Sequence, residues 1–194
     1  MEIGATKAVQ DRLKTTNIEE SKGASLVFCW DTHLTKIKGR NVLFIVNASN
    51  RYTIAMTDIK PRNWNYYTMY ISRVIHGVMQ EMGYSEDQIG QYFKMSGDTT
   101  VTKTHGRKSV GGINRMVMDA QYFGKKLEKE AKYQWELSEY LNRDICQPEG
   151  FDAYGYPSEL FKLDMERLGI VTKRKPAKII DFTKYIDTNR STNH

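Results

Sequence analysis

The chain has 194 residues, 40% of them hydrophobic, and a formal net charge of +6. It is long enough to bury a hydrophobic core without disulfide bonds or a structural metal ion. Its basic character excludes an acidic mimic of DNA. Cys29 and Cys146 are far apart and form no CxxC pair, which favours free thiols in a reducing compartment. The longest apolar run, residues 42–46, is too short to cross a bilayer, and no signal-peptide pattern is present. We therefore expect a cytoplasmic protein without a membrane partner.

The first third of the chain predicts a sheet. Residues 25–30 and 42–46 are apolar runs of strand length, and residues 31–38 alternate between polar and apolar side chains. Residues 47–50 are typical of a turn, so residues 51–56 are expected to return as a hairpin partner. Three or four antiparallel strands should form by this point.

Helices are expected next. From Trp64 to Met82 the apolar residues follow helical spacing, and Pro61 stands just ahead of them. The sequence Ser85-Glu-Asp-Gln88 is a capping box and predicts a second helix over residues 85–96. A further strand begins near residue 99, followed by a helix from about Ile113.

The composition changes near Gly124. Residues 125–143 are rich in Glu, Lys and Leu, which predicts a long helix to about Ile145, broken by Pro148. The predicted fold class is α+β, with a mixed, largely antiparallel sheet and helices packed on it. We divide the chain into an α/β domain over residues 1–124 and a helical C-terminal extension over residues 125–194.

The stretch between the last strand and its helix is strongly basic. It contains four cations and no acid between residues 99 and 115, and Ser109 or Asn114 could cap the helix. A helix N-terminus beside cations predicts a phosphate or nucleic-acid site, although a solvated turn would look the same. The candidate contacts are Lys103, Arg107, Lys108, Ser109, Asn114, Arg115 and, from the hairpin turn, Arg51.

His105 lies at the centre of this basic turn. Beside Lys103 and Arg107 its imidazole is expected to deprotonate easily, so it could be a general base near neutral pH. The three side chains could then serve a metal-independent ribonuclease, whereas an exposed turn histidine is the alternative. The spacing of His, Cys, Asp and Glu resembles no metal site, so we expect neither a metal nor a cofactor. Tyr66 and Tyr70 lie off the apolar helix face and are candidates for stacking on bases.

Three segments carry a resemblance to a known family. They are Ser25-Leu-Val-Phe-Cys-Trp30, the strand 42–46 with Asn47 and Arg51-Tyr52, and Thr102-Lys-Thr-His-Gly-Arg-Lys-Ser109 with Asn114. Together they resemble a small bacterial domain of unknown function, found on plasmids and phage-related elements, although Lys108 is an extra residue in the last segment. The resemblance covers about residues 1–124 and implies a mixed α/β fold without established chemistry. The same region is similar to the N-terminal part of some type II anti-CRISPR proteins.

The resemblance implies a mobile-element inhibitor of a type II RNA-guided nuclease, acting in the cytoplasm of the bacterial host. Because the chain is basic, we expect contact with the guide RNA or with the effector–RNA assembly. An RNA-directed nuclease or phosphate-binding enzyme, and a plain nucleic-acid-binding accessory protein, remain as alternatives. The sequence leaves open whether there is catalysis and which oligomeric state the protein adopts.

Overall fold

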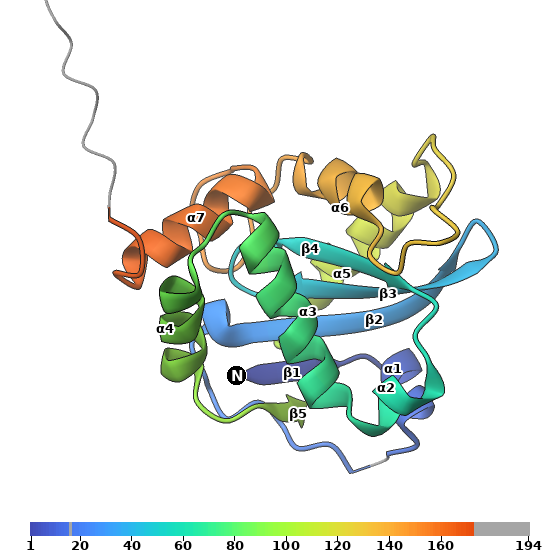
Figure 1. Cartoon of the computed structure of the whole chain (residues 1–194), viewed down its shortest axis with the longest axis horizontal. Coiled ribbons are helices and arrows are strands. Elements are labelled where there is room, and N and C mark those ends of the chain that lie inside the picture. Colours follow the sequence, from blue (N-terminus) through green and yellow to red (C-terminus); the bar gives the residue numbers. More distant parts are fainter. Residues whose placement is uncertain (16, 173–194) are drawn as a thin grey trace, which may run out of the picture.

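The structure, a computed structural model, describes residues 1–15 and 17–172 (Figure 1). At its centre is a five-stranded sheet in the order β4-β3-β2-β1-β5. The strands are β1 (Glu2–Ala5), β2 (Cys29–Ile37), β3 (Arg40–Asn47), β4 (Thr53–Thr57) and β5 (Thr100–Thr102). Strand β1 pairs in parallel with β2 and β5, whereas β2–β3 and β3–β4 are antiparallel. The predicted α+β class with a mixed sheet is confirmed.

Helices cover both faces of the sheet. They are α1 (Lys7–Leu13), α2 (Pro61–Asn65), α3 (Tyr67–Glu81), α4 (Glu86–Ser96), α5 (Gly106–Gln121), α6 (Trp135–Asn142) and α7 (Pro157–Arg167). A short 3-10 helix, Leu26–Phe28, precedes β2, so the strand expected from residue 25 begins only at Cys29. The backbone N–H of Phe28 donates to the Ser25 carbonyl at 2.8 Å, which forms this turn. None of the helices described is long and apolar enough to cross a membrane.

Alternation along the strands separates two apolar layers. On one face, Leu43 and Ile45 of β3 belong to a core with α3, α4 and α7. On the other face, Val42 and Phe44 belong to a second core with α5 and α6. Figure 1 shows α3 crossing in front of the sheet, with α5 behind it. The strand pattern therefore fixes which helices lie on which side.

The region after Gly124 departs from the prediction. Residues 123–134 contain no helix, and α6 covers only Trp135–Asn142, so the long helix to Ile145 is wrong. Leu127, Leu137 and Leu141 are buried in the core that α5 forms with the sheet. Their apolar side chains hold this segment against the sheet. The prediction of a long helix considered only the Glu and Lys pairs of residues 125–143 and not this burial. The part of the predicted extension beyond residue 172 lies outside the described residues.

The segment before α6 also pairs with β4. Thr57 donates its backbone N–H to Lys132 at 2.7 Å, and Gln134 donates to Ala55 at 2.9 Å. Asn142 of α6 accepts from the Thr53 N–H at 2.7 Å and donates to the Thr53 carbonyl at 2.8 Å. At the opposite edge of the sheet, Glu19 forms a parallel bridge with Thr102 of β5.

Candidate functional site

The helix that follows the basic turn begins earlier than predicted. α5 starts at Gly106, with His105 as its N-cap residue, and not near Ile113. Gly106 has φ 88°, a conformation that glycine adopts without strain and that lets the chain turn sharply into the helix. Ser109 and Asn114 therefore lie inside α5, and neither caps it.

The cap comes from β2. A carboxylate oxygen of Asp31 accepts the backbone N–H of His105 at 3.2 Å, and the other accepts the hydroxyl of Ser109. Asp31 is fully buried, so it needs these partners. Gly4 of β1 makes room for it, because a Cβ atom there would lie 1.8 Å from the Asp31 carboxylate. A negative charge at the N-terminus of α5 also complements the helix dipole.

His105 is held between two carboxylates. Its Nδ1 atom lies 2.7 Å from Asp31, and its Nε2 atom lies 3.0 Å from Glu2. Burial alone would lower the pKa of His105, but the hydrogen bond to Asp31 and the proximity of Cys29 outweigh it and raise this pKa from 6.5 to about 10. The expectation of an easily deprotonated histidine is wrong, because the acids that contact it come from β1 and β2 and not from its own turn.

Glu2 completes this network. Its carboxylate accepts the Ser21 hydroxyl at 2.6 Å and the Lys22 backbone N–H at 2.9 Å. Burial would raise the pKa of Glu2, but hydrogen bonds from Ser21, Lys22 and His105 together lower it below its usual value. We call Glu2, Asp31, His105 and Ser109 the buried ion network.

The predicted phosphate contacts are spread around α5. Arg51 donates to the Gly112 carbonyl at 2.9 Å, and Lys108 donates to the Pro148 carbonyl at 3.2 Å. Other residues are paired with acids, Lys103 with Glu20 and Arg115 with Asp119. Most of these cations are therefore already engaged within the protein.

Two of the predicted residues do come together. Arg107 is exposed and forms no ion pair with the described part of the chain, and Asn114 lies on the same side of α5. They line a shallow depression of about 440 Å³. Its other lining residues are Thr104, Gly106, Val110 and Gly111. Ser109, by contrast, lies on the buried face of α5, and its hydroxyl donates to the Asp31 carboxylate.

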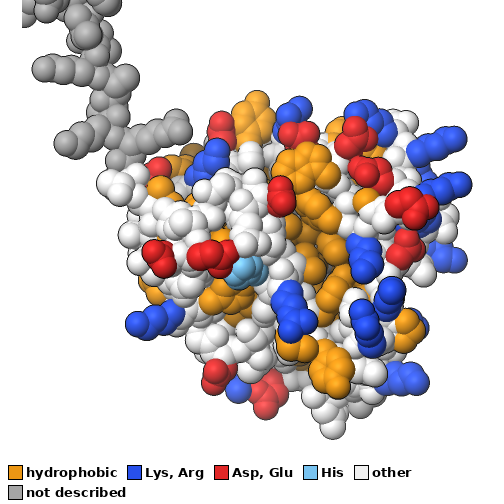
Figure 2. Space-filling view, viewed as in Figure 1, with side chains coloured by type: hydrophobic (Ala, Val, Ile, Leu, Met, Phe, Trp, Pro, Cys, Tyr) orange, Lys and Arg blue, Asp and Glu red, His pale blue; other side chains and the backbone are white. Residues whose placement is uncertain are grey.

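A second basic surface has no counterpart among the predicted sites. A hollow of about 540 Å³ lies between α1, the β2–β3 turn and α2. We call it the basic groove, and its lining residues are Arg12, Leu34, Gly39, Arg40, Asn41, Asp58, Ile59 and Trp64. Arg40 pairs with Asp58, whereas Arg12 forms no ion pair within the described residues. Figure 2 shows Lys and Arg side chains gathered at the lower right of the molecule, where α1 and α2 lie in Figure 1.

Aromatic rings accompany these cations. The Arg12 guanidinium lies 5.6 Å from the centre of the Trp64 ring, and Trp64 stacks on Tyr67 at 5.6 Å. Tyr66, one residue beyond α2, is 64% exposed. Of the two tyrosines predicted as contact residues, Tyr66 is available to a ligand, whereas Tyr70 is half-buried against the core.

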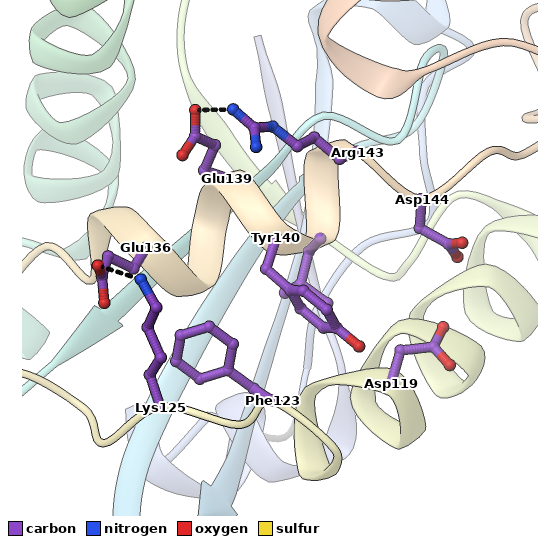
Figure 3. Close-up of a pocket in the computed structure, with 9 residues that line it drawn as sticks. Asp119, Phe123, Lys125, Glu136, Glu139, Tyr140, Arg143 and Asp144 are labelled. Carbon is purple, nitrogen blue, oxygen red and sulfur yellow. Dashed lines mark hydrogen bonds and ion pairs between the residues drawn. The ribbon is translucent and has the colours of Figure 1, made fainter.

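A third hollow, of about 420 Å³, lies between α5 and α6 (Figure 3). Lys125 pairs with Glu136 at 2.6 Å, and Arg143 pairs with Glu139 at 2.8 Å. Tyr140 packs on Phe123 rather than standing free. Because both cations here are paired and two further acids, Asp119 and Asp144, line the hollow, it is a poorer candidate than the basic groove for a phosphate-bearing ligand.

Comparison with known proteins places the chain in a family. The family model described as "Domain of unknown function (DUF6933)" matches residues 2–160. The chain belongs to this family. The DUF6933 match runs from β1 into α7, so it includes the buried ion network and continues past residue 124. No curated protein and no solved structure shows a significant match. The resemblance to a domain of unknown function is thereby confirmed.

Proposed function

We propose that this DUF6933 protein is a non-enzymatic RNA-binding protein, and that the basic groove binds single-stranded RNA. The observation that carries this proposal is the Arg12 guanidinium over the Trp64 ring, which lines the groove. Tyr66 follows Trp64 by two residues in the chain and is exposed. Single strands are bound by cations that follow the phosphates and by aromatic rings on which bases stack. Lys60 and Arg62 are exposed at the start of α2 and add positive charge near the same surface.

In the cell, we propose that the ligand is the guide RNA of a type II RNA-guided nuclease and that binding inhibits the effector. The resemblance to anti-CRISPR proteins and the net charge of +6 support this role. Guide RNA presents phosphates and unpaired bases, whereas an effector surface that binds DNA would attract an acidic inhibitor.

The buried ion network does not favour the alternative of a ribonuclease. The side chain of His105 is 2% exposed, and both of its ring nitrogens are hydrogen bonded to carboxylates. A general base must reach the proton that it removes, and this ring is enclosed within the protein. We therefore assign the network to the support of α5.

The proposal is tested by titrating a fluorescent single-stranded RNA with the protein and measuring anisotropy. Tyr66→Ala should weaken binding by about 1–3 kcal/mol if the ring stacks on a base. Arg12→Gln/Arg62→Gln should also weaken it, whereas Lys94→Gln/Lys162→Gln removes the same charge from α4 and α7 and should have little effect. Arg107→Ala/Lys108→Ala measures the depression on α5 separately. Equal losses in the groove and control variants would overturn the assignment to the groove.

The cellular role needs a second measurement. The protein is added to a reconstituted type II effector with its guide RNA, and cleavage of target DNA is followed. Inhibition by the wild type that is lost in Tyr66→Ala would support the role. RNA binding without inhibition would leave the groove in place and remove the proposed target.

A further inference from the structure

Three metal-ligating side chains meet beneath the start of α5. Glu2, Cys29 and His105 each offer one ligand atom, and these atoms all lie within 4.8 Å of one another. All three residues are buried. The basic groove is formed by other residues, so this cluster is separate from the proposed RNA site.

The sheet register explains why these residues meet. Glu2 of β1 is the direct partner of Cys29 of β2 in a parallel pair. Partners in adjacent strands project their side chains to the same face, here the face that α5 covers. His105 reaches them from the N-cap of α5. The cluster therefore joins two central strands to one helix.

We propose that Glu2, Cys29 and His105 bind a divalent metal ion of the zinc class, with Asp31 as a positioning residue. Thiolate, imidazole and carboxylate are the three side-chain ligands that zinc takes in proteins. A mixed sulfur, nitrogen and oxygen set disfavours magnesium and calcium, which prefer oxygen alone. Three protein ligands would leave a fourth position for a water molecule.

The Glu2–His105 distance is close to the one that coordination requires, and the Cys29 sulfur lies within 4.8 Å of both ligand atoms. The Nε2 atom of His105 lies 3.0 Å from the Glu2 carboxylate. Bonds of about 2.1 Å at a tetrahedral angle place two ligand atoms about 3.4 Å apart. Glu2 and His105 would therefore separate by a few tenths of an ångström, a movement that rotation of the Glu2 side chain can supply. The Cys29 sulfur would approach them by at most about 1.2 Å.

Asp31 is placed to orient the histidine. Its carboxylate lies 2.7 Å from Nδ1, the ring nitrogen that faces away from Glu2. A histidine that binds metal through one nitrogen commonly donates its other N–H to a carboxylate, which fixes the tautomer and the ring plane. Asp31 is itself held by the His105 backbone N–H and the Ser109 hydroxyl. The supporting shell is thus present.

Coordination requires the thiolate of Cys29 and the neutral ring of His105, so the metal ion competes with protons at both side chains.

The test uses Co²⁺ as a probe of the full-length protein after chelator treatment. Cobalt bound to a thiolate gives a charge-transfer band in the near ultraviolet, and we expect this band to saturate at one Co²⁺ per chain. Zn²⁺ should remove the band by displacement. Metal is added both to native protein and during refolding, because the cluster is buried.

The cysteines provide a matched pair of variants. Cys29 and Cys146 are the only two in the chain, and both are buried. The band should persist in Cys146→Ser and disappear in Cys29→Ser. If Cys29→Ser fails to fold, the band in Cys146→Ser still decides, because only Cys29 can supply its thiolate. Absence of the band in the wild type, or its loss in Cys146→Ser alone, would overturn the proposal.

Discussion

The Nδ1 atom of His105 lies 2.7 Å from a carboxylate oxygen of Asp31, across 74 positions of the chain. This hydrogen bond ties the N-cap of α5 to a strand that lies between β1 and β3 in the sheet. The same carboxylate accepts from Ser109, inside the first turns of α5. The position of the helix is therefore set by a buried charge and not by its own residues.

The stability of the fold should depend on the protonation of His105. Its pKa is raised from 6.5 to about 10, because its hydrogen bond to Asp31 and the proximity of Cys29 outweigh the effect of burial. The resulting stabilisation is complete below about pH 6.5 and is lost as the pH rises through about 10. In that window the free energy of unfolding should fall by at most about 1.4 kcal/mol per pH unit.

Urea unfolding between pH 6 and pH 10, in the presence of a chelator, measures this slope. His105→Gln should have a lower stability at pH 6 and a flatter pH profile. His33→Gln is the matched control, since His33 is half-buried and lies outside the network. A wild-type profile as flat as that of His105→Gln would show that the ring is neutral.

Gly4→Ala should destabilise the protein. The added Cβ atom would lie 1.8 Å from the Asp31 carboxylate, so either the strand or the carboxylate must move. Overpacking of this kind costs about 1–3 kcal/mol. Gly77→Ala in α3 meets nothing within 4 Å and should stabilise the helix by about 0.5–1 kcal/mol. Thermal unfolding of the two variants compares them, and equal effects would contradict the close packing at Gly4.

Asn142→Ala should lower the free energy of unfolding, even though Asn142 lies in the segment predicted as a separate extension. Its amide bonds both backbone groups of Thr53, at 2.7 and 2.8 Å, and Thr53 is buried. Each orphaned group costs about 1–3 kcal/mol. Asn17→Ala, at an exposed position, is the control. Unchanged stability in Asn142→Ala would mean that water replaces the amide.

A chain shortened to residues 1–124 tests the predicted domain boundary directly. It lacks Leu127, Leu137 and Leu141, which fill the core beneath α5. We expect this fragment to show no cooperative thermal transition, whereas residues 1–172 should unfold cooperatively. A sharp transition in the short fragment would establish residues 1–124 as an independent domain.

RNA binding by the basic groove should weaken as salt rises. Each phosphate contact contributes roughly −0.7 to the slope of log K against log salt for a single strand. Arg12→Gln should therefore make the slope shallower by about that amount, while Tyr66→Ala should leave it nearly unchanged. Anisotropy titrations at several salt concentrations separate the two effects, and identical slopes for both variants would contradict the assigned contacts.

The sequence predicted the features that depend on local patterns. The apolar run at residues 42–46 lies within β3, and the capping box forms as expected, with the Gln88 N–H donating to Ser85 at 3.3 Å. Tyr66 is exposed as expected, although it lies between α2 and α3 and not within the single helix predicted from Trp64 to Met82. In each case the residues that decide the structure are neighbours in the chain.

The start of α5 and the buried ion network depend on distant residues instead. Local cap candidates pointed to a helix near Ile113, but Asp31 supplies the cap from β2. Glu2 and Cys29 meet only because β1 pairs in parallel with β2. A charged residue next to an apolar one in the first strand, Glu2 before Ile3, is the only local sign that a buried carboxylate was possible.

The pairing at the two outer strands has a consequence for association with other molecules. Backbone groups of β4 form hydrogen bonds with residues 132–134 and with Asn142. At β5, Glu19 forms a bridge with Thr102 and accepts the Lys103 N–H. An unpaired outer strand is a template for a strand from another chain. Along the residues that the structure describes, these contacts obstruct such addition on both sides. Partners must then be recognised by side chains on the helices and turns, and strand-to-strand aggregation of the native protein is disfavoured.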